Sequence, residues 1–426
     1  MYKFILDYKC SSDDNTIMSD LNLQNPYRPG AGHPPPFLAG RDKEITEFSL
    51  LLDQQVIIKN CILTGLRGVG KTVLLNELKK TAINKNWLWT SNEISESSSA
   101  TEEKICYRLI ADLAMVTSGI LLSDSEKELI TFFPENSKVR SALDYKALEL
   151  IYQNAPGLNS DKLKFIFEFV WSIIRSHMPH IHGIVIAYDE SQSLSDNVKL
   201  DRYPLTLLLD VFQSIQRKEI PFMLLLSGLP TIQTKLVESR TYSERMFTVL
   251  FLKKLSTEDS ILAITKPVNE QSFPIQFDDR SVNLVVKKSG GYPYFIQFIC
   301  KEIFDIFIQQ HAAGQKLSVP IEAILRKLDD DFFSGRWGLL TDRQRELLAV
   351  VSHLSSCEEE FSVQEVVNES KKYEISAFGN SQINQMFLTL ITQGFIFKNR
   401  FGKYSFAVPQ LGEFILRQKI IKEKQA

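Results

Sequence analysis

The sequence predicts an α/β fold: a three-layer core in which helices cover a parallel β-sheet, followed by a helical lid and a C-terminal winged helix. Uninterrupted apolar runs at 184–188 and 221–226 suit strands that are buried on both faces, as in a parallel sheet between helices. Helical patterns alternate with such runs up to about residue 255. The strand-like runs then stop, and a helical block extends to about residue 334.

The composition is that of an ordinary globular chain. Its 426 residues are 44% hydrophobic and 23% charged, and this length exceeds one compact core, so we expect two or three domains. The net charge of −2 provides no overall basic field, so any DNA contact needs a local basic patch. The five cysteines are widely separated, which is typical of reduced thiols. With no signal-peptide pattern and no apolar run of about 20 residues, we expect a cytoplasmic protein.

Each element of the core has its own signal. The Pro- and Gly-rich stretch 25–36 is typical of neither helix nor strand, and Ser99-Ala-Thr-Glu102 has the pattern of a capping box at a helix start. The helix 161–178 is apolar almost all round, so we expect it to pack on more than one side. Residues 120–160 are ambiguous, with helix and loop character. The other expected core elements are helix 43–53, strand 60–64, helix 71–85, strand 86–91, helix 102–117, strand 184–188, helix 204–217, strand 221–226 and strand 246–252.

The segment Gly65–Thr72 is the most informative motif. It reads Gly-Leu-Arg-Gly-Val-Gly-Lys-Thr behind an apolar strand, and this fits G-x-x-x-x-G-K-[ST], the P-loop that cradles the phosphates of a nucleoside triphosphate. Lys71 is expected to reach the β- and γ-phosphates of ATP, and the Thr72 hydroxyl to bind Mg²⁺. The expected nucleotide contacts of this motif are Gly65, Leu66, Arg67, Gly68, Val69, Gly70, Lys71, Thr72 and Val73.

A second acidic motif completes the nucleotide chemistry. The apolar strand 184–188 ends in Asp189 and Glu190. In P-loop enzymes an Asp at this position holds Mg²⁺ opposite the P-loop hydroxyl, and the adjacent acid polarises the attacking water. We therefore expect Asp189 to bind Mg²⁺ together with Thr72, and Glu190 to act as the catalytic acid–base group. Gln192 is a candidate for orienting Glu190 or the water.

This order of P-loop, acid pair and third buried strand resembles the AAA+ class of P-loop ATPases. The resemblance implies a polar γ-phosphate sensor at the end of strand 221–226, where the candidate is Ser227. It also implies an arginine finger before the last strand that reaches the nucleotide of a neighbouring subunit. Arg245 is the first candidate and Arg240 the second, and the alternative is a surface arginine paired with Glu244 or Glu238.

Within AAA+, the chain is similar to the origin-recognition-like group, and in particular to a bacterial family of ATP-binding proteins. The motifs that carry this likeness are Asn25–Pro35 and Leu38–Glu44, and the likeness covers nearly the whole chain, 25–420. It implies that Phe37, Leu38 and Arg41 lie near the adenine base.

The predicted lid contains Ser289–Tyr294, which resembles the G-x-P element of STAND-type signalling ATPases. That resemblance implies that Pro293 touches the adenine side of the nucleotide. The arginine that AAA+ proteins usually carry at the start of this helix is replaced by Tyr292 and Tyr294. Slow turnover, more typical of a switch than of a motor, is therefore expected.

The C-terminal segment has the pattern of a winged helix. Helices are expected at 342–353, 362–368 and 381–393, followed by a wing across 395–408. In DNA-binding winged helices the third helix enters the major groove, but here that helix has no Lys or Arg. Base contacts would fall to Gln382, Asn384 and Gln385, and phosphate contacts to Lys371, Lys372, Lys398, Arg400 and Lys403. The alternative is a winged helix that packs on its own lid or on a protein partner.

Two other clusters are interpreted as structural. The histidines of His177–His182 have metal-like spacing, but Pro179 interrupts them and no Cys or acid cluster accompanies them. The acidic runs 329–331 and 358–360 are expected to be solvated helix ends.

The sequence thus predicts four segments: a flexible arm (1–25), an AAA+ nucleotide-binding core (26–255), a helical lid (256–335) and a winged-helix domain (336–426). The predicted function is that of an ATP-binding, slowly hydrolysing switch whose nucleotide state controls self-association or partner binding. Two alternatives remain at this point. One is a DNA-binding ATPase of replication or transposition type, and the other is a STAND-like signalling or defence switch acting on a protein effector.

Overall fold

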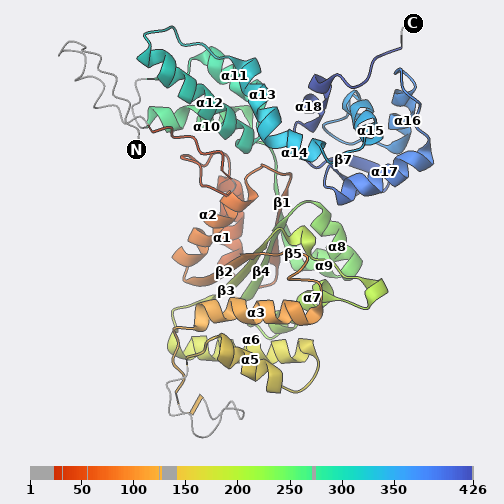
Figure 1. Cartoon of the computed structure of the whole chain (residues 1–426). Helices are drawn as coiled ribbons and strands as arrows, with labels where there is room; N and C mark the ends of the chain where they lie inside the picture. Colours follow the sequence, from red (N-terminus) through yellow and green to blue (C-terminus); the bar gives the residue numbers. More distant parts are fainter. Residues whose placement is uncertain are drawn as a thin grey trace, which may run out of the picture.

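The computed structural model describes residues 24–30, 32–54, 56–123, 125–126, 142–270 and 275–424. The predicted arm at 1–25 lies almost entirely outside these residues, as does the stretch 127–141 within the ambiguous region. Figure 1 shows an α/β core, a helical lid above it and a C-terminal unit beside the lid. Among the described residues, no helix has the length and apolar character to span a membrane.

The core contains one five-stranded sheet, in which all pairings are parallel and the strand order is β2-β3-β4-β1-β5. The predicted α/β class with a parallel sheet is confirmed, and each expected strand is present with ends shifted by one or two residues. The strands are β1 (Asn60–Gly65), β2 (Trp87–Glu93), β3 (Gly183–Asp189), β4 (Phe222–Gly228) and β5 (Phe247–Leu252).

Both faces of the sheet are covered by helices, which is why the strands are apolar without interruption. Alternate residues of β3 enter two hydrophobic clusters: Ile184 and Ile186 belong to one, and Val185 and Ala187 to the other. The first cluster includes residues of α3 (Glu102–Thr117), α5 (Tyr145–Asn154), α6 (Asn159–His177) and α7 (Pro204–Arg217). The second includes residues of α1 (Asp42–Leu52) and α2 (Lys71–Asn84).

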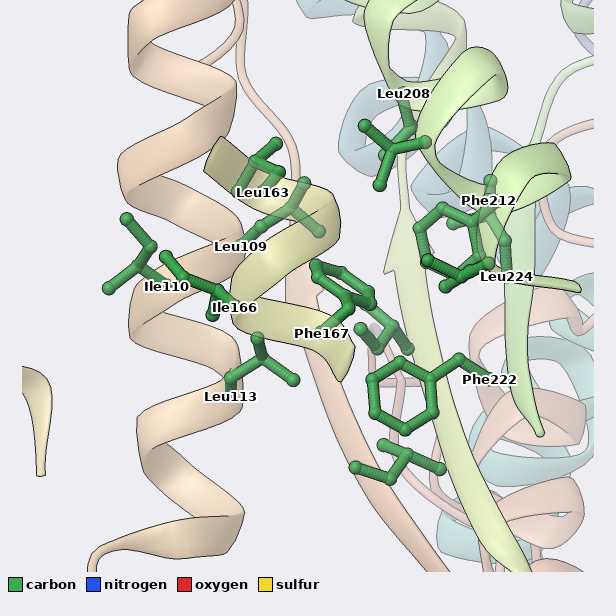
Figure 2. Close-up of a cluster of buried hydrophobic side chains, with 14 of the residues drawn as sticks. Leu109, Ile110, Leu113, Leu163, Ile166, Phe167, Leu208, Phe212, Phe222 and Leu224 are labelled. Carbon is green, nitrogen blue, oxygen red and sulfur yellow. The ribbon is translucent and has the colours of Figure 1, made fainter. Parts of the chain in front are cut away.

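Helix α6 packs on two sides, as its apolar pattern predicts. It contacts α3 and α5 in one direction and α7 in another. Figure 2 shows Phe167 of α6 among Phe212, Phe222 and Leu224, and its ring centroid lies 5.1 Å from that of Phe222. Burial of such a side chain contributes roughly 1.5–3 kcal/mol to folding. This packing holds the neighbouring strands β3 and β4, whose ends carry the functional side chains.

The start of α3 differs from the prediction. The helix begins at Glu102, and its N-cap is Thr101, whose hydroxyl accepts a hydrogen bond from the Lys104 amide at 3.3 Å. Ser99, the expected cap, instead donates its hydroxyl to the Ser95 carbonyl at 2.8 Å. The Ser-rich segment thus forms its own turn, and this turn takes Ser99 away from the helix end.

After β5 the chain forms the helical lid, in agreement with the helical pattern from residue 256. Between β4 and β5 lie α8 (Thr231–Ser239) and α9 (Ser243–Met246). The lid helices are α10 (Thr257–Asn269), α11 (Asp279–Ser289), α12 (Pro293–Ala312) and α13 (Ile321–Leu328), followed by a π-helical turn at Asp329–Phe333 and the short α14 (Ser334–Trp337).

The C-terminal unit contains the three helices and the hairpin that the sequence predicts. They are α15 (Asp342–Ser352), α16 (Val363–Ser370), α17 (Asn380–Thr392), β6 (Ile396–Arg400) and β7 (Lys403–Phe406). The sequence did not predict α18 (Leu411–Gln418), which packs against α15. The winged-helix assignment stays a prediction, although the order of elements agrees with it.

The lid and the C-terminal unit share one hydrophobic cluster. Across the expected boundary at 335/336, the rings of Phe333 and Phe414 stack with centroids 4.8 Å apart. Asp329 lies beside them and accepts a hydrogen bond from Arg417 Nε at 2.8 Å. The expectation of a solvated acidic run is therefore wrong for Asp329, which is only 7% exposed, because burial beside an aromatic stack requires a paired charge.

Candidate nucleotide-binding site

The parallel sheet brings the predicted residues together at the carboxyl ends of its strands. Because β1, β4 and β3 are neighbours and run in the same direction, Gly65, Ser227 and Asp189 all lie at the carboxyl ends of adjacent strands. In open α/β sheets, ligands bind at the carboxyl ends of the strands. The sequence predicted each residue separately, and the strand order explains why they meet.

The P-loop follows β1 directly and leads into α2. Gly68 and Gly70 have φ angles of 72° and 94°, a left-handed region that glycine adopts without strain. The Lys71 ammonium folds back onto the loop and donates to the carbonyls of Gly65 (2.9 Å) and Leu66 (3.0 Å). Burial lowers the pKa of Lys71 to about 8, although the nearby carboxylates Glu190 and Asp189 oppose this change. The loop therefore holds a cation that an anionic ligand would stabilise.

The carboxylate of Asp189 accepts hydrogen bonds from two hydroxyl groups. Its Oδ2 accepts a hydrogen bond from Thr72 Oγ1 at 2.7 Å, and its Oδ1 accepts one from the fully buried Ser227 Oγ, also at 2.7 Å. Ser227 thus touches Asp189 directly. The Thr72 hydroxyl and the Asp189 carboxylate are the hard oxygen ligands that Mg²⁺ prefers, so the residues fit this metal.

Glu190 lies at the turn after β3, with a left-handed φ of 52°. The Gln192 side-chain amide donates to the Glu190 carboxylate, and Gln192 Oε1 accepts from the Leu229 amide at 3.0 Å. This second bond fixes which way the amide points, so Gln192 orients Glu190. Of the two partners that the sequence suggested for Gln192, Glu190 is the one it contacts.

A cavity of about 300 Å³ lies between the P-loop, the segment before α1 and the lid. Its predicted lining residues are Phe37, Leu38, Arg41, Arg67, Gly68, Val69, Gly70, Lys71, Thr72, Val73, Glu190 and Pro293. Gly65 and Leu66, also expected to contact the nucleotide, are not among the residues that line it. Sequence reasoning missed the contribution of Arg28, Gly30, Gly32 and His33 from the Pro- and Gly-rich stretch, and of Tyr294, Gln297 and Phe332 from the lid. The only signal for the first group was a composition that excludes helix and strand.

The stretch that precedes α1, which we call the strap (24–30 and 32–36), is anchored on the lid. Asn25 Nδ2 donates to Asp305 Oδ1 at 2.7 Å, and the Tyr27 hydroxyl donates to the Ile264 carbonyl. At the other end, Gly32 has φ 71° and lies against Thr72, since a Cβ on Gly32 would be 3.2 Å from Thr72 Cγ2. The strap therefore connects the lid to the phosphate end of the cavity.

Arg41 lines the cavity, and its place near the adenine base stays a prediction. Its guanidinium is 5% exposed, and Nη2 donates to the carbonyls of Val69 (3.0 Å) and Lys253 (2.9 Å). Burial lowers the pKa of Arg41, and the nearby carboxylates Glu44 and Asp259 raise it again in part. Arg41 lines the cavity, but its hydrogen bonds brace the P-loop against the chain that leaves β5.

The two arginine-finger candidates differ in their surroundings. Arg240 makes a bidentate contact with Asp210, at 3.1 Å from Nε and 2.8 Å from Nη2, and Asp210 also accepts from the Tyr242 hydroxyl. Arg245 is exposed and lines a surface hollow with Ile58 and Tyr242, away from the nucleotide cavity of its own chain. Arg240 is thus held by partners within its own chain, whereas Arg245 is exposed.

Three of the predicted phosphate contacts, Lys398, Arg400 and Lys403, lie on the hairpin. Lys398 Nζ lies 5.5 Å from the ring centroid of Phe401, and Lys403 Nζ lies 3.2 Å from Glu365 Oε2. The side chain of Arg400 is outside the described part of the structure. Within that part, no group of three or more His, Cys, Asp or Glu side chains is arranged to hold a metal ion. His177 instead lies 3.0 Å from Glu126.

Comparisons with known proteins agree with this architecture. A family model described as a domain of unknown function (DUF8462) matches residues 330–415, and no curated protein sequence matches the chain. Among solved structures, the Walker-type ATPase PABY2304 of Pyrococcus abyssi is similar with a TM-score of 0.55 and 14% identity, covering 89% of this chain and 96% of that one. The Aeropyrum pernix ORC2 protein in its ADP form is similar with a TM-score of 0.50 and 14% identity, covering 92% and 97%.

The comparisons and the sheet topology agree on the fold. The chain has the fold of an AAA+ P-loop ATPase of the origin-recognition-like type, as the sequence predicted. At 14% identity the likeness to solved structures concerns the fold alone.

Proposed function

We propose that this protein is an ATP-binding and slowly hydrolysing AAA+ switch. The observation that carries the proposal is that Lys71, Thr72 and Glu190 line a single cavity, and that Asp189 is hydrogen-bonded to Thr72 beside it. Lys71 binds the β- and γ-phosphates, and the glycine-rich backbone N–H groups of the loop bind the phosphate oxygens. Leu38 and Pro293, which line the same cavity, contact the base.

Each catalytic side chain has a role that its contacts support. Thr72 and Asp189 hold Mg²⁺, which when bound neutralises charge on the phosphates. Glu190, held by Gln192, accepts a proton from the attacking water. Ser227 fixes the second oxygen of Asp189 and so acts as a positioning residue for the magnesium site.

The exposed position of Arg245 supports self-association. An exposed arginine away from its own cavity supplies charge to a second subunit's nucleotide, as arginine fingers do. Within each chain, the core (26–255), the lid (256–335) and the winged helix (336–426) would then move as units around a nucleotide in the cytoplasm.

The surface of the C-terminal unit favours a protein partner over DNA. The exposed residues of α17 include the neutral Gln382, Asn384 and Gln385, together with Leu388, which is 68% exposed. At the hairpin tip Phe401 is 95% exposed, and Lys403 is already paired with Glu365. Phosphate binding needs several free cations, whereas exposed apolar side chains suit a protein surface.

The test separates binding from chemistry. Lys71→Ala removes the phosphate-binding ammonium and should abolish ATP binding, while Lys79→Ala, an exposed lysine on the same helix, should bind ATP as the wild type does. Glu190→Gln should keep ATP binding and lose hydrolysis, because an amide does not accept a proton from water. Equal turnover by the wild type and Glu190→Gln would exclude the role of Glu190. Equal ATP binding by Lys71→Ala and Lys79→Ala would exclude the site.

A further inference from the structure

Arg67 lines the nucleotide cavity, and Arg336, from a distant part of the chain, lies close enough to feel its charge. Arg67 belongs to the P-loop and lines the cavity together with Glu190. Arg336 belongs to α14, at the point where the lid, the core and the C-terminal unit meet (Figure 1). Phe332, one helical turn before Arg336, lines the same cavity. The two guanidinium groups act on each other: the pKa of Arg336 is lowered first by burial and then by the charge of Arg67.

Each of these arginines has a buried nitrogen without a hydrogen-bond partner among the described residues. The atoms are Arg67 Nε and Arg336 Nη1. Leaving a charged N–H group buried and unpaired is costly, and two adjacent cations add repulsion. The acid that acts on Arg336 is Glu190, whose carboxylate already accepts from Gln192. Such a pair is stabilised when an anion binds between the two guanidinium groups.

We infer that Arg67 and Arg336 form a two-arginine site for the terminal phosphate of bound ATP. The inference rests on the proposed function and adds to it the residues that distinguish a triphosphate from a diphosphate. The charge of Arg67 also lowers the pKa of Lys71, so Arg67 lies near the phosphate-binding ammonium. Arg336 then supplies, from the end of the lid, the cation that is absent from the start of α12, where Tyr292 and Tyr294 stand.

The same two arginines connect the nucleotide to the C-terminal unit. A Cβ on Gly394, between α17 and β6, would lie 3.7 Å from Arg67 Nη2. Trp337, next to Arg336, packs edge-on against Phe414 of α18, with ring centroids 5.6 Å apart. A shift of either guanidinium toward a phosphate therefore changes a contact with the C-terminal unit. This is a physical route by which the third phosphate alters that unit's position.

The affinities of a non-hydrolysable ATP analogue and of ADP, measured with Mg²⁺ by titration calorimetry, test the inference. Arg336→Gln should weaken binding of the analogue by about tenfold or more, the loss expected for a charge-assisted hydrogen bond, and change ADP binding by less than about twofold. Arg67→Gln should weaken binding of the analogue by at least as much and more than it weakens ADP binding. Arg326→Gln, an exposed arginine on α13, is the matched control and should bind both nucleotides as the wild type does. Arg336→Lys keeps the charge and should recover part of the loss.

The outcomes separate this inference from the proposed function. A wild-type protein that binds neither nucleotide overturns both. A wild type that binds ATP, with Arg336→Gln and Arg67→Gln unchanged or equally weakened for both nucleotides, overturns the two-arginine site alone. Thermal unfolding confirms that each variant is folded. Hydrogen exchange around Gly394 should differ between analogue and ADP in the wild type and not in Arg67→Gln, and equal exchange in the wild type overturns the link to the C-terminal unit.

Discussion

Binding of ATP should be accompanied by proton uptake at Lys71. Without ligand, burial places the pKa of this ammonium at about 8, below its ordinary value of 10.5. A bound triphosphate favours the charged form, so the pKa rises when ATP binds. From the unliganded pKa of about 8, the uptake should be about 0.1 proton at pH 7, about 0.5 at pH 8 and about 0.9 at pH 9.

The sign follows from the two states. Well below pH 8, at about pH 6, both forms carry the proton, and ATP binding takes up almost none. Above pH 8 the free protein has lost it while the complex keeps it, so the apparent ATP affinity falls by up to about tenfold per pH unit. The assay is titration calorimetry in two buffers with different ionisation enthalpies, because the slope of the apparent enthalpy against the buffer's ionisation enthalpy is the number of protons taken up.

Two variants identify the group. Lys71→Arg keeps a cation that stays protonated, so its proton uptake at pH 8 should be near zero. Glu190→Gln removes the carboxylate that raises the pKa of Lys71 most, so proton uptake at pH 8 should exceed that of the wild type. Near-zero uptake by the wild type at pH 8, or the same uptake in Lys71→Arg, would refute the reasoning.

Three further predictions concern the other units. Arg245→Ala should lose much of the roughly 10³–10⁵-fold acceleration of ATP hydrolysis that arginine fingers supply, and should keep its affinity for ATP. Mixing this variant with Lys71→Ala should restore some hydrolysis. Arg240→Ala, whose partner is Asp210 within the chain, should gain no hydrolysis from mixing. Lys398→Glu should leave DNA binding and its salt dependence unchanged, and a slope smaller by about one unit in a salt series would instead favour DNA as the partner. Phe167→Ala should destabilise the core by about 3–5 kcal/mol in denaturant unfolding, whereas Phe165→Ala on the same helix, with 47% exposure, should cost far less; similar losses would contradict the packing in Figure 2.

The strands and the P-loop were predictable from sequence because their signals are local. A strand buried on both faces has to be apolar throughout, and β3 and β4 are. A loop that wraps phosphates needs glycine where φ is positive, and Gly68 and Gly70 meet that need. Helix ends were less predictable: the choice of Thr101 over Ser99 depends on the turn that the preceding serines form.

Contacts between distant segments could not be predicted, since neither partner carries a local mark. The sequence gives no sign that Arg41 braces Val69 and Lys253, or that Asp329 pairs with Arg417. The acidic run 329–331 was predicted to be solvated because such runs usually lie on the surface of a protein. The π-helical turn at the end of the lid instead carries Asp329 into the aromatic cluster.

Contacts between distant segments also bear on the arginine that AAA+ proteins usually carry at the start of α12. The sequence shows that the arginine usual at the start of this lid helix is replaced, because Tyr292 and Tyr294 stand there. In the folded chain, α14 follows α13 through the π-helical turn and brings Arg336 within reach of Arg67 and Glu190. A role that AAA+ proteins assign to one helix start can thus be met by a residue more than 40 positions later in the chain, because electrostatics depends on distance in space. In the proposed switch, the segment that contacts the third phosphate would also be the segment that joins the C-terminal unit.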